Sequence, residues 1–272
     1  MAGHWHLWDC CHHGNLKGVK RELAKGANVN SKQDYWQNDW IEHADIPCLT
    51  AAVWSERDDV VSLLLSQPGI DVDATDYMDF TALHQACSLG YREMVRKLLA
   101  SGANVNCRND DGDTPLSNAV HGGHKEVVSL LMGVPGLDIE IKDLKNQGPL
   151  HVACENGSVD IARLLLTCGA NVNSRECSGK TPLMLAFEAE GNEELTTGNE
   201  EVIFLLLEHP AIDVNARDSE GMTALHCAME VVRAHRSIDE AYGDCVRLLA
   251  EKAHVDLDAK DNRGRSIMQI AR

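Results

Sequence analysis

The motif Thr-Ala-Leu-His-Gln-Ala-Cys at residues 81–87 returns in variant form along almost the whole chain. Copies begin at Thr114, Gly148, Thr181 and Thr223, and looser copies begin at Pro47 and Ser266. A spacing of about 33 residues is typical of a solenoid, in which each repeat packs only against its neighbours. We therefore expect function to lie on a continuous surface rather than in a buried pocket.

Each repeat carries the signals of two helices joined by a tight turn. A threonine such as Thr114 stands where its hydroxyl can cap a helix, and proline follows at the first helical position. Leucine and alanine then recur three residues apart on one helical face, as in Leu83 and Ala86. A glycine turn leads to a second apolar helix, which ends at a glycine such as Gly102. One repeat cannot bury this apolar face alone, so stacking of neighbours is expected to stabilise it.

This pattern resembles the ankyrin repeat, and the resemblance covers Leu7 to Arg272. It implies an all-α fold, an ankyrin-repeat solenoid of helix-turn-helix units with β-hairpin-like fingers. We expect a single array over residues 1–272. Its repeats are predicted at residues 4–45, 46–79, 80–112, 113–146, 147–179, 180–221 and 222–264, with a partial repeat at 265–272.

Three insertions interrupt the pattern, within Ser31–Ile46, around Glu190–Asn199 and around Val232–Glu240. The second is polar and flanked by glycine, so a mobile loop is expected there, whereas the third can lengthen helices instead. The chain stops at Arg272, part-way through a repeat and without the polar cap that terminal repeats need. We therefore expect it to be part of a longer protein.

The formal net charge of −17 disfavours binding to a phosphate backbone, which needs clustered lysine and arginine. It fits a partner with basic groups, or it serves solubility alone. The ten cysteines form no C-x-x-C pair, and several occupy helix core positions, so reduced thiols in an intracellular protein are expected. The sequence holds no leader-like apolar run and no apolar stretch of about 20 residues. The predicted location is the cytoplasm, with the nucleus as an alternative.

The resemblance implies that partners bind the finger tips and the exposed end of each first helix. In this chain those positions are aromatic or apolar in the first three repeats and acidic beside them. The candidate partner-binding residues are Tyr35, Trp36, Trp40, Trp54, Tyr77, Met78, Phe80 and Leu89, with Asp110, Asp111 and Asp113 next to them. Tyrosine and tryptophan are common interface anchors. The alternatives are that these rings shield their own finger and that the acidic face is merely solvated.

The partner that fits this surface is an extended protein segment or peptide with an apolar anchor and lysine or arginine beside it. Association is expected to weaken with salt. Nucleic acid binding, membrane insertion and a cofactor are not expected.

Other residue clusters give weaker signals. The terminal set His4, His6, Cys10, Cys11, His12 and His13 could bind metal by residue type, but a zinc site needs about four ligands in a tetrahedral array. We expect these residues to serve the first helix instead. His84, His151 and His226 recur at one repeat position and are expected to make local hydrogen bonds. Trp5 and Trp8 are expected to flank and cap the first helix.

Three asparagines, Asn106, Asn173 and Asn215, resemble ankyrin asparagines that a cytosolic oxygenase can hydroxylate. Each follows a valine, and a leucine stands eight residues earlier, at Leu98, Leu165 and Leu207. Asn30 shares the Val-Asn pair. Hydrogen bonding within the finger is expected whether or not they are modified.

These observations favour a non-enzymatic interaction module, a scaffold or adaptor. One alternative is a nucleotide or small-ligand sensor, in which Trp54 and Tyr77 would stack on a base, although Lys32 and Arg57 are the few cations nearby. A second alternative is a targeting domain of a larger enzyme whose catalytic part lies outside this chain. The sequence contains no G-x-S-x-G, P-loop or metalloprotease motif.

Overall fold

A computed structural model of the chain describes residues 6–33, 45–188, 197–234, 240–252 and 254–270. The chain divides into two compact units, Met1–Asp138 and Ile139–Arg272, here called unit 1 and unit 2. Each is built from paired antiparallel helices linked by hairpin-like loops, which we call fingers.

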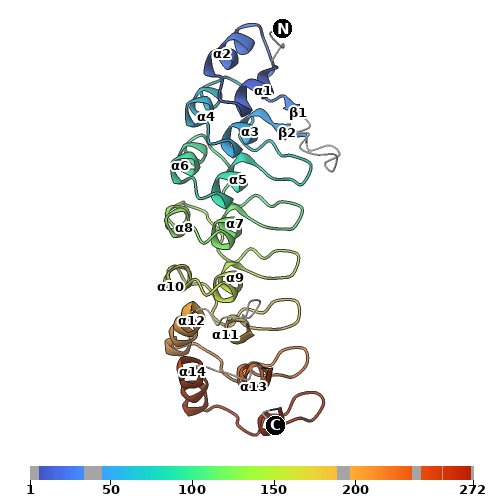
Figure 1. Cartoon of the computed structure of the whole chain (residues 1–272), viewed down its shortest axis with the longest axis vertical. Coiled ribbons are helices and arrows are strands. Elements are labelled where there is room, and N and C mark those ends of the chain that lie inside the picture. Colours follow the sequence, from blue (N-terminus) through green and yellow to red (C-terminus); the bar gives the residue numbers. More distant parts are fainter. Residues whose placement is uncertain (1–5, 34–44, 189–196, 235–239, 253, 271–272) are drawn as a thin grey trace. The chain divides into compact units, whose positions relative to one another are not determined.

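Unit 1 stacks its helix pairs in two layers (Figure 1). Its elements are α1 (Leu7–His12), α2 (Leu16–Ala24), β1 (Lys32–Gln33), β2 (Ile46–Pro47), α3 (Cys48–Trp54), α4 (Asp58–Leu65), α5 (Ala82–Ser88), α6 (Arg92–Ala100), α7 (Pro115–His121) and α8 (Lys125–Met132). The first helices of successive pairs contact one another, α1 on α3, α3 on α5 and α5 on α7. The fingers leave from this layer, on the side away from the second helices.

Unit 2 repeats the arrangement with longer helices toward its end. Its elements are α9 (Pro149–Glu155), α10 (Val159–Thr167), α11 (Pro182–Glu188), α12 (Thr197–Glu208), α13 (Ala224–Ala234), α14 (Glu240–Glu251) and α15 (Ile267–Ile270). Helix α9 packs on α11, α11 on α13 and α13 on α15.

The structure describes only the edges of the three predicted insertions. Around the first, Lys32 pairs with Pro47 and Gln33 with Ile46 in a short antiparallel ladder, β1–β2. Helix α13 runs to 11 residues against 7 in the first helix α11, and α14 runs to 12 against 9 in the second helix α10, so the helices beside the third insertion are longer. Residues 34–44, 189–196 and 235–239 lie outside the described residues, and the mobile loop expected near 190–199 is therefore untested.

In α5 the recurring threonine and histidine start the helix by capping one another. The Thr81 hydroxyl accepts from the His84 backbone N–H at 3.3 Å, and the Thr81 N–H donates to His84 Nδ1 at 3.2 Å. This reciprocal arrangement is a capping box in which histidine replaces the usual glutamate. Ser117 does the same for Thr114, whose N–H donates to the Ser117 hydroxyl at 2.6 Å.

The other histidine nitrogen fastens the finger that follows. His84 Nε2 donates to the Asp113 carbonyl and His151 Nε2 to the Ser174 carbonyl, both at 3.1 Å. Since Nδ1 accepts and Nε2 donates, each ring is neutral, and burial lowers the pKa of both histidines to about 4. The local hydrogen bonds expected for these two histidines are confirmed.

Each finger turns around one polar side chain that accepts backbone N–H groups from its own loop. The Asp218 carboxylate accepts from Glu220 at 2.9 Å and from Met222 at 2.8 Å. Six positions share this role: Asp76, Asn109, Asp143, Glu176, Asp218 and Asp261. The loop then passes through a left-handed residue, which is glycine in four fingers but Asp79 and Asn146 in two.

Four Val-Asn asparagines each tie the start of a finger to the turn after the next second helix. Asn106 Nδ2 donates to the Gly136 carbonyl at 2.7 Å, and its oxygen accepts from the Asp138 N–H at 2.9 Å. Asn30, Asn173 and Asn215 make the same pair of bonds. These asparagines therefore have a structural role whether or not they are hydroxylated, and hydroxylation itself stays a prediction that intact mass spectrometry can test.

Candidate partner-binding surface

Trp54 ends α3 at the edge of an aromatic cluster in unit 1. The His12 ring stacks on Trp8 with centroids 5.1 Å apart and meets Trp54 edge-on at 6.4 Å. His12 Nδ1 and the Ser55 hydroxyl lie 2.6 Å apart. Trp54 remains 41% exposed at the edge of this cluster.

Trp8 is a core residue rather than a flanking one. It lies inside α1, is 3% exposed, and its Nε1 donates to the Ile46 carbonyl of β2 at 2.9 Å. The expectation that Trp8 flanks the first helix was wrong in this respect, because its ring fills the space between α1 and β2. Trp5 lies outside the described residues.

The apolar side chains of the finger at residues 75–81 differ in their exposure to solvent. Tyr77, at the tip, is 55% exposed. Phe80 is half-buried, with its ring centroid 5.4 Å from that of His84. Met78 is also half-buried, and its carbonyl accepts from the Asp110 N–H at 3.0 Å, which joins two neighbouring fingers. Among these three side chains Tyr77 is the most exposed.

Acidic side chains cluster where these two fingers meet. Asp79, Asp110 and Asp111 are exposed. Partial desolvation and the carboxylates of Asp79 and Asp111 raise the pKa of Asp110. Asp113 differs, because its backbone N–H and carbonyl bond to Asn109 and His84 within the fold and its side chain is half-buried.

Of the remaining predicted partner-binding residues, one lies in the part of the chain that the structure describes and three lie outside it. Leu89 is the C-cap of α5 and is half-buried. Tyr35, Trp36 and Trp40 lie outside the described residues, so their part in the surface stays a prediction. Within unit 1 the structure thus presents Trp54 and Tyr77 as exposed aromatic side chains, with Asp79, Asp110 and Asp111 beside Tyr77's finger.

His124 is a feature of this face that the sequence analysis missed. Its Nε2 donates to the Ser88 carbonyl at 2.8 Å, where α5 ends. A Cβ atom added to Gly90 or to Gly122 would lie 2.5 Å from the His124 ring, so these glycines form the slot that holds it. The Gly-Gly-His run at 122–124 is the sequence signal for this packing.

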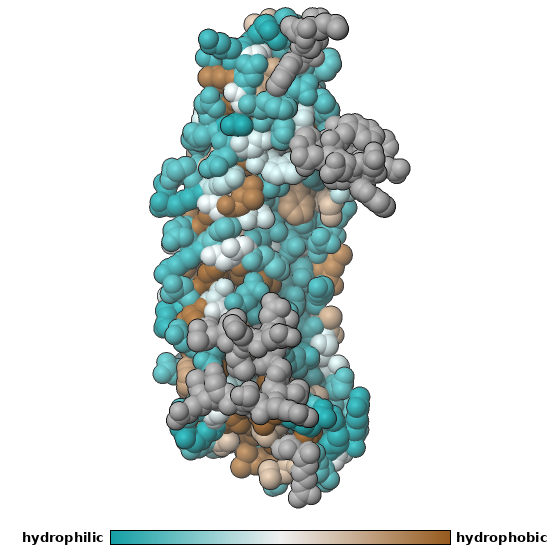
Figure 2. Space-filling view, in the orientation of Figure 1, coloured by the Kyte–Doolittle hydropathy of each residue, from teal (hydrophilic) through white to brown (hydrophobic). Residues whose placement is uncertain are grey.

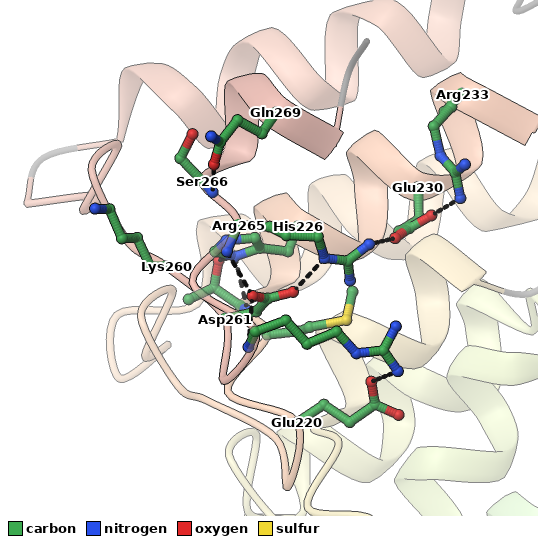
Figure 3. Close-up of polar contacts among 12 residues, drawn as sticks. Glu220, His226, Glu230, Arg233, Lys260, Asp261, Arg265, Ser266 and Gln269 are labelled. Atoms are coloured by element: carbon green, nitrogen blue, oxygen red, sulfur yellow. Dashed lines mark hydrogen bonds and ion pairs between the residues drawn. The ribbon is translucent and has the colours of Figure 1, made fainter.

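The polar cluster of the last finger is structural (Figure 3). Arg265 Nε lies 2.6 Å from an Asp261 carboxylate oxygen, and its NH1 lies 3.1 Å from Glu230. Glu230 also pairs with Arg233, and Arg263 lies 3.7 Å from Glu220. These arginines are matched by carboxylates, so the cluster fixes α13 to the last finger.

Within the ranges that the structure describes, no group of three or more His, Cys, Asp and Glu side chains is arranged to hold a metal ion. Cys10 and Cys11 are both buried, and His4 lies outside these ranges. The described helices include none that is long and apolar enough to cross a bilayer. The face in Figure 2 is mostly hydrophilic, with small separate apolar groups.

A family model for ankyrin repeats in three copies matches residues 7–109, 49–143, 83–176 and 134–218. The chain belongs to the ankyrin-repeat family. The crystal structure of the ankyrin repeat domain of Bcl-3, a member of the IkappaB protein family, superposes with a TM-score of 0.68. That match has 28% sequence identity and covers 89% of this chain and 98% of the Bcl-3 domain.

Two relatives show how widely these repeats are used. Alpha-latrotoxin-Lh1a of Latrodectus hasselti is 31% identical over 181 residues, which are 66% of this chain and 12% of the toxin. The NF-kappa-B inhibitor cactus of Drosophila melanogaster is 30% identical over 191 residues, which are 67% of this chain and 35% of cactus. The chain thus spans only a minor part of these relatives. The fold is in general an interaction module, similar here to IkappaB family members.

Proposed function

We propose that this chain is a scaffold or adaptor module that binds a protein segment on the finger and helix-end face of unit 1. The exposed anchors are Trp54 and Tyr77, with Leu89 at the adjoining helix end. Tyr35, Trp36 and Trp40 of the preceding finger belong to the same proposed surface. The observation that carries the proposal is the exposure of two large aromatic side chains, at 41% and 55%, on a fold whose other apolar residues are mostly buried.

The acidic side chains beside these anchors favour a partner that carries basic groups. Asp79, Asp110 and Asp111 present carboxylates at the tips of two joined fingers, and the raised pKa of Asp110 reflects their mutual repulsion together with partial desolvation. A lysine or arginine on the partner would relieve that repulsion. The segment that fits therefore carries an apolar side chain for Trp54 and Tyr77 and a basic side chain for the aspartates, and its binding weakens with salt.

The proposed location is intracellular. All ten cysteines are free thiols, and most of those in helices are buried, as suits a reducing compartment. The IkappaB relatives that share this fold support an interaction role rather than a catalytic one.

The test uses the immobilised chain and its Trp54→Ala, Tyr77→Ala double variant to capture proteins from cell lysate, with quantitative mass spectrometry of the captured set. We expect the variant to lose at least one partner by about tenfold, as hot-spot truncation does. A Leu257→Ala, Met268→Ala variant is the matched control, because both residues are exposed apolar side chains of unit 2, at 55% and 69%. Equal capture by all three folded proteins would rule out the unit 1 surface.

A further inference from the structure

The fingers of unit 2 carry a row of basic side chains at matching positions. Lys142, Arg175, Arg217 and Lys260 each stand one residue before the side chain around which their finger turns, and Lys145 lies at the tip of the first finger. Arg175, Arg217, Lys260 and Lys145 are exposed, and Lys142 is half-buried. We call these five residues the basic row.

The row is held in place by bonds between neighbouring fingers. Lys142 Nζ donates to the Arg175 carbonyl at 2.7 Å, and Asn146 Nδ2 donates to the same carbonyl at 2.8 Å. Arg175 NH1 donates to the Arg217 carbonyl, and Arg217 NH2 donates to the Lys260 carbonyl. Backbone bonds add to this, with Cys177 donating to Lys145 at 2.9 Å and Ser219 to Ser178 at 2.8 Å. Lys142, Arg175 and Arg217 are therefore preorganised, which lowers the entropy lost on binding.

The carboxylates around which these fingers turn accept backbone N–H groups, and two of the four are buried while Asp143 and Asp218 are half-buried. Glu176 and Asp261 are 8% and 6% exposed, and their oxygens accept amides of their own turns. Burial alone would raise the pKa of Glu176, but hydrogen bonds from Ser178 and Lys180 hold it at about 2. Glu176 and Asp261 thus hold their carboxylates inside their turns while Arg175 and Lys260 beside them stay exposed, in a chain whose net charge is −17.

The exposed arginines of the basic row bond to backbone carbonyls, whereas Arg263 and Arg265 of the last finger pair with carboxylates. Arg263 and Arg265 are matched by Glu220, Asp261 and Glu230, whereas Lys260 points away from that cluster (Figure 3). In the described part of unit 2, Arg175, Arg217 and Lys260 form no ion pair with a carboxylate, and the arginines use only carbonyl partners. A guanidinium has five N–H donors, so most remain available for a second acceptor.

An apolar side chain stands within the row. Leu144 lies between Asp143 and Lys145 at the first finger tip and is 73% exposed, more than any other large apolar residue described. A surface that combines one exposed leucine with several fixed cations fits a protein segment that carries both carboxylates and an apolar side chain.

We propose that the basic row and Leu144 form a second docking surface, for an acidic, leucine-containing segment of a protein partner. Exposed carboxylates at the finger bases, Asp213, Asp256 and Asp258, flank the row. They would repel a continuous polyphosphate, whereas a peptide places carboxylates only opposite the cations. The two surfaces of the chain therefore select partners of opposite charge.

The experiment measures fluorescence anisotropy of a fluorescein-labelled peptide of aspartate, glutamate and leucine as the whole chain is titrated in. Arg175→Gln with Arg217→Gln is expected to weaken binding by about tenfold, because two cations aligned with carboxylates are removed. Arg163→Gln with Arg247→Gln removes the same charge from exposed helix positions of unit 2 and is expected to change affinity by less than about twofold.

A second variant separates the effect of lost charge from the effect of lost bonds between fingers. Lys145→Gln with Lys260→Gln removes two side chains that hold no finger together, so a loss of peptide binding here reports on charge alone. The proposal is overturned if the peptide does not bind, or if the row variants bind like the control pair. It is also overturned if single-stranded DNA of equal charge binds more tightly with the same dependence on Arg175 and Arg217, or if a second copy of the chain competes for the row.

Discussion

The histidine of the recurring motif links helix start and finger through one neutral ring. His84 accepts at Nδ1 from Thr81 and donates at Nε2 to Asp113, and it is fully buried. Protonation would place a second donor against the Thr81 N–H, which is why burial and this geometry both disfavour the charged ring. The residue therefore makes folding depend on pH.

This dependence has a defined direction. The pKa of His84 falls from its ordinary 6.5 to about 4 in the folded chain, so below pH 6.5 the unfolded state binds a proton that the folded state excludes. The stability from this residue is fully present above pH 6.5 and is lost as the pH falls toward 4. Between pH 7 and pH 5 the loss is about 2 kcal/mol.

Urea unfolding at both pH values measures this loss. The His84→Ser variant imitates Ser117, which caps Thr114 without titrating, so it should lose about 2 kcal/mol less than the wild type between pH 7 and pH 5. Ser117→Ala is the control, because it removes a cap and should lower stability equally at both values. If the free energy of unfolding changed equally between pH 7 and pH 5 in the wild type and in His84→Ser, His84 would not be the source of this pH dependence.

Residue identity predicted the capping threonines and the local role of the histidines, because both follow from repeat position. It did not separate Tyr77 from Phe80, or Asp110 from Asp113. These pairs differ in exposure, and each finger turn has its own bonds: Met78 and Phe80 donate to the Asp76 carboxylate in the first, and Asp113 donates to Asn109 in the second. The sequence names the aromatic and acidic residues of a finger but not which of them face outward.

At the scale of elements, two features constrain a finger turn: the residue in the left-handed conformation and the contact with the next finger. Gly221 and Gly264 occupy equivalent turns with φ of 79° and 77°. A Cβ at Gly221 would lie 2.5 Å from Asn262 Oδ1 and 3.0 Å from the Asn262 nitrogen, whereas a Cβ at Gly264 would meet nothing within 4 Å. The two positions share backbone strain and differ only in contact with the next finger.

Alanine at these two sites separates the two effects. Gly264→Ala should lower the free energy of unfolding by about 1–2 kcal/mol, the cost of a left-handed alanine. Gly221→Ala should cost about 1 kcal/mol more, because Asn262 must move and its N–H bond to the Glu220 carbonyl is disturbed. Thermal and urea unfolding give both values, and equal losses would show that finger contact contributes nothing at Gly221.

Helices α11, α13 and α14 meet around an aromatic pair that the repeat pattern does not specify. Phe187 and Tyr242 are 1% and 2% exposed, with centroids 5.9 Å apart in a T-shaped contact. The Tyr242 hydroxyl lies 3.4 Å from the carbonyls of Phe187 and Ala228. The sequence analysis expected lengthened helices as one outcome of the third insertion, but the ring that fills the space lies 55 positions from its partner along the chain and carries no local signal.

Phe187 and Tyr242 should contribute to the free energy of unfolding as buried core residues do. Phe187→Ala should cost about 3–5 kcal/mol, because it leaves a cavity. Tyr242→Phe should cost about 1 kcal/mol or less, since it keeps the ring and removes the 3.4 Å hydrogen bonds to the Phe187 and Ala228 carbonyls. If calorimetry or urea unfolding found the hydroxyl more costly to remove than the Phe187 ring, Tyr242 would have a polar role that this packing does not provide.

For the molecule as a whole, net charge conceals the distribution that governs binding. The value of −17 disfavours nucleic acid as a general partner, which stays a prediction, and the sequence located the acidic finger tips of unit 1. It did not reveal the basic row of unit 2, because an aspartate or glutamate directly follows Lys142, Arg175, Arg217 and Lys260. The hydrogen bonds that draw Glu176 and Asp261 into their turns leave the preceding Arg175 and Lys260 exposed.

Two surfaces of opposite charge predict a crossed pattern of variant effects. A labelled peptide of arginine and leucine should lose about tenfold in affinity on Trp54→Ala with Tyr77→Ala and less than about twofold on Arg175→Gln with Arg217→Gln. The aspartate, glutamate and leucine peptide should show the reverse. Both affinities should fall as salt rises from 50 to about 300 mM, since each contact pairs exposed charges.

Separate titrations of the two peptides against the same four proteins test this pattern: wild type, each double variant and the two combined. The combined variant should lose both peptides by the factors of the single sets, because residues in separate units with no shared partners act additively. If both peptides followed the same variant, one surface would serve both charges, and selection by charge between the two units would be wrong.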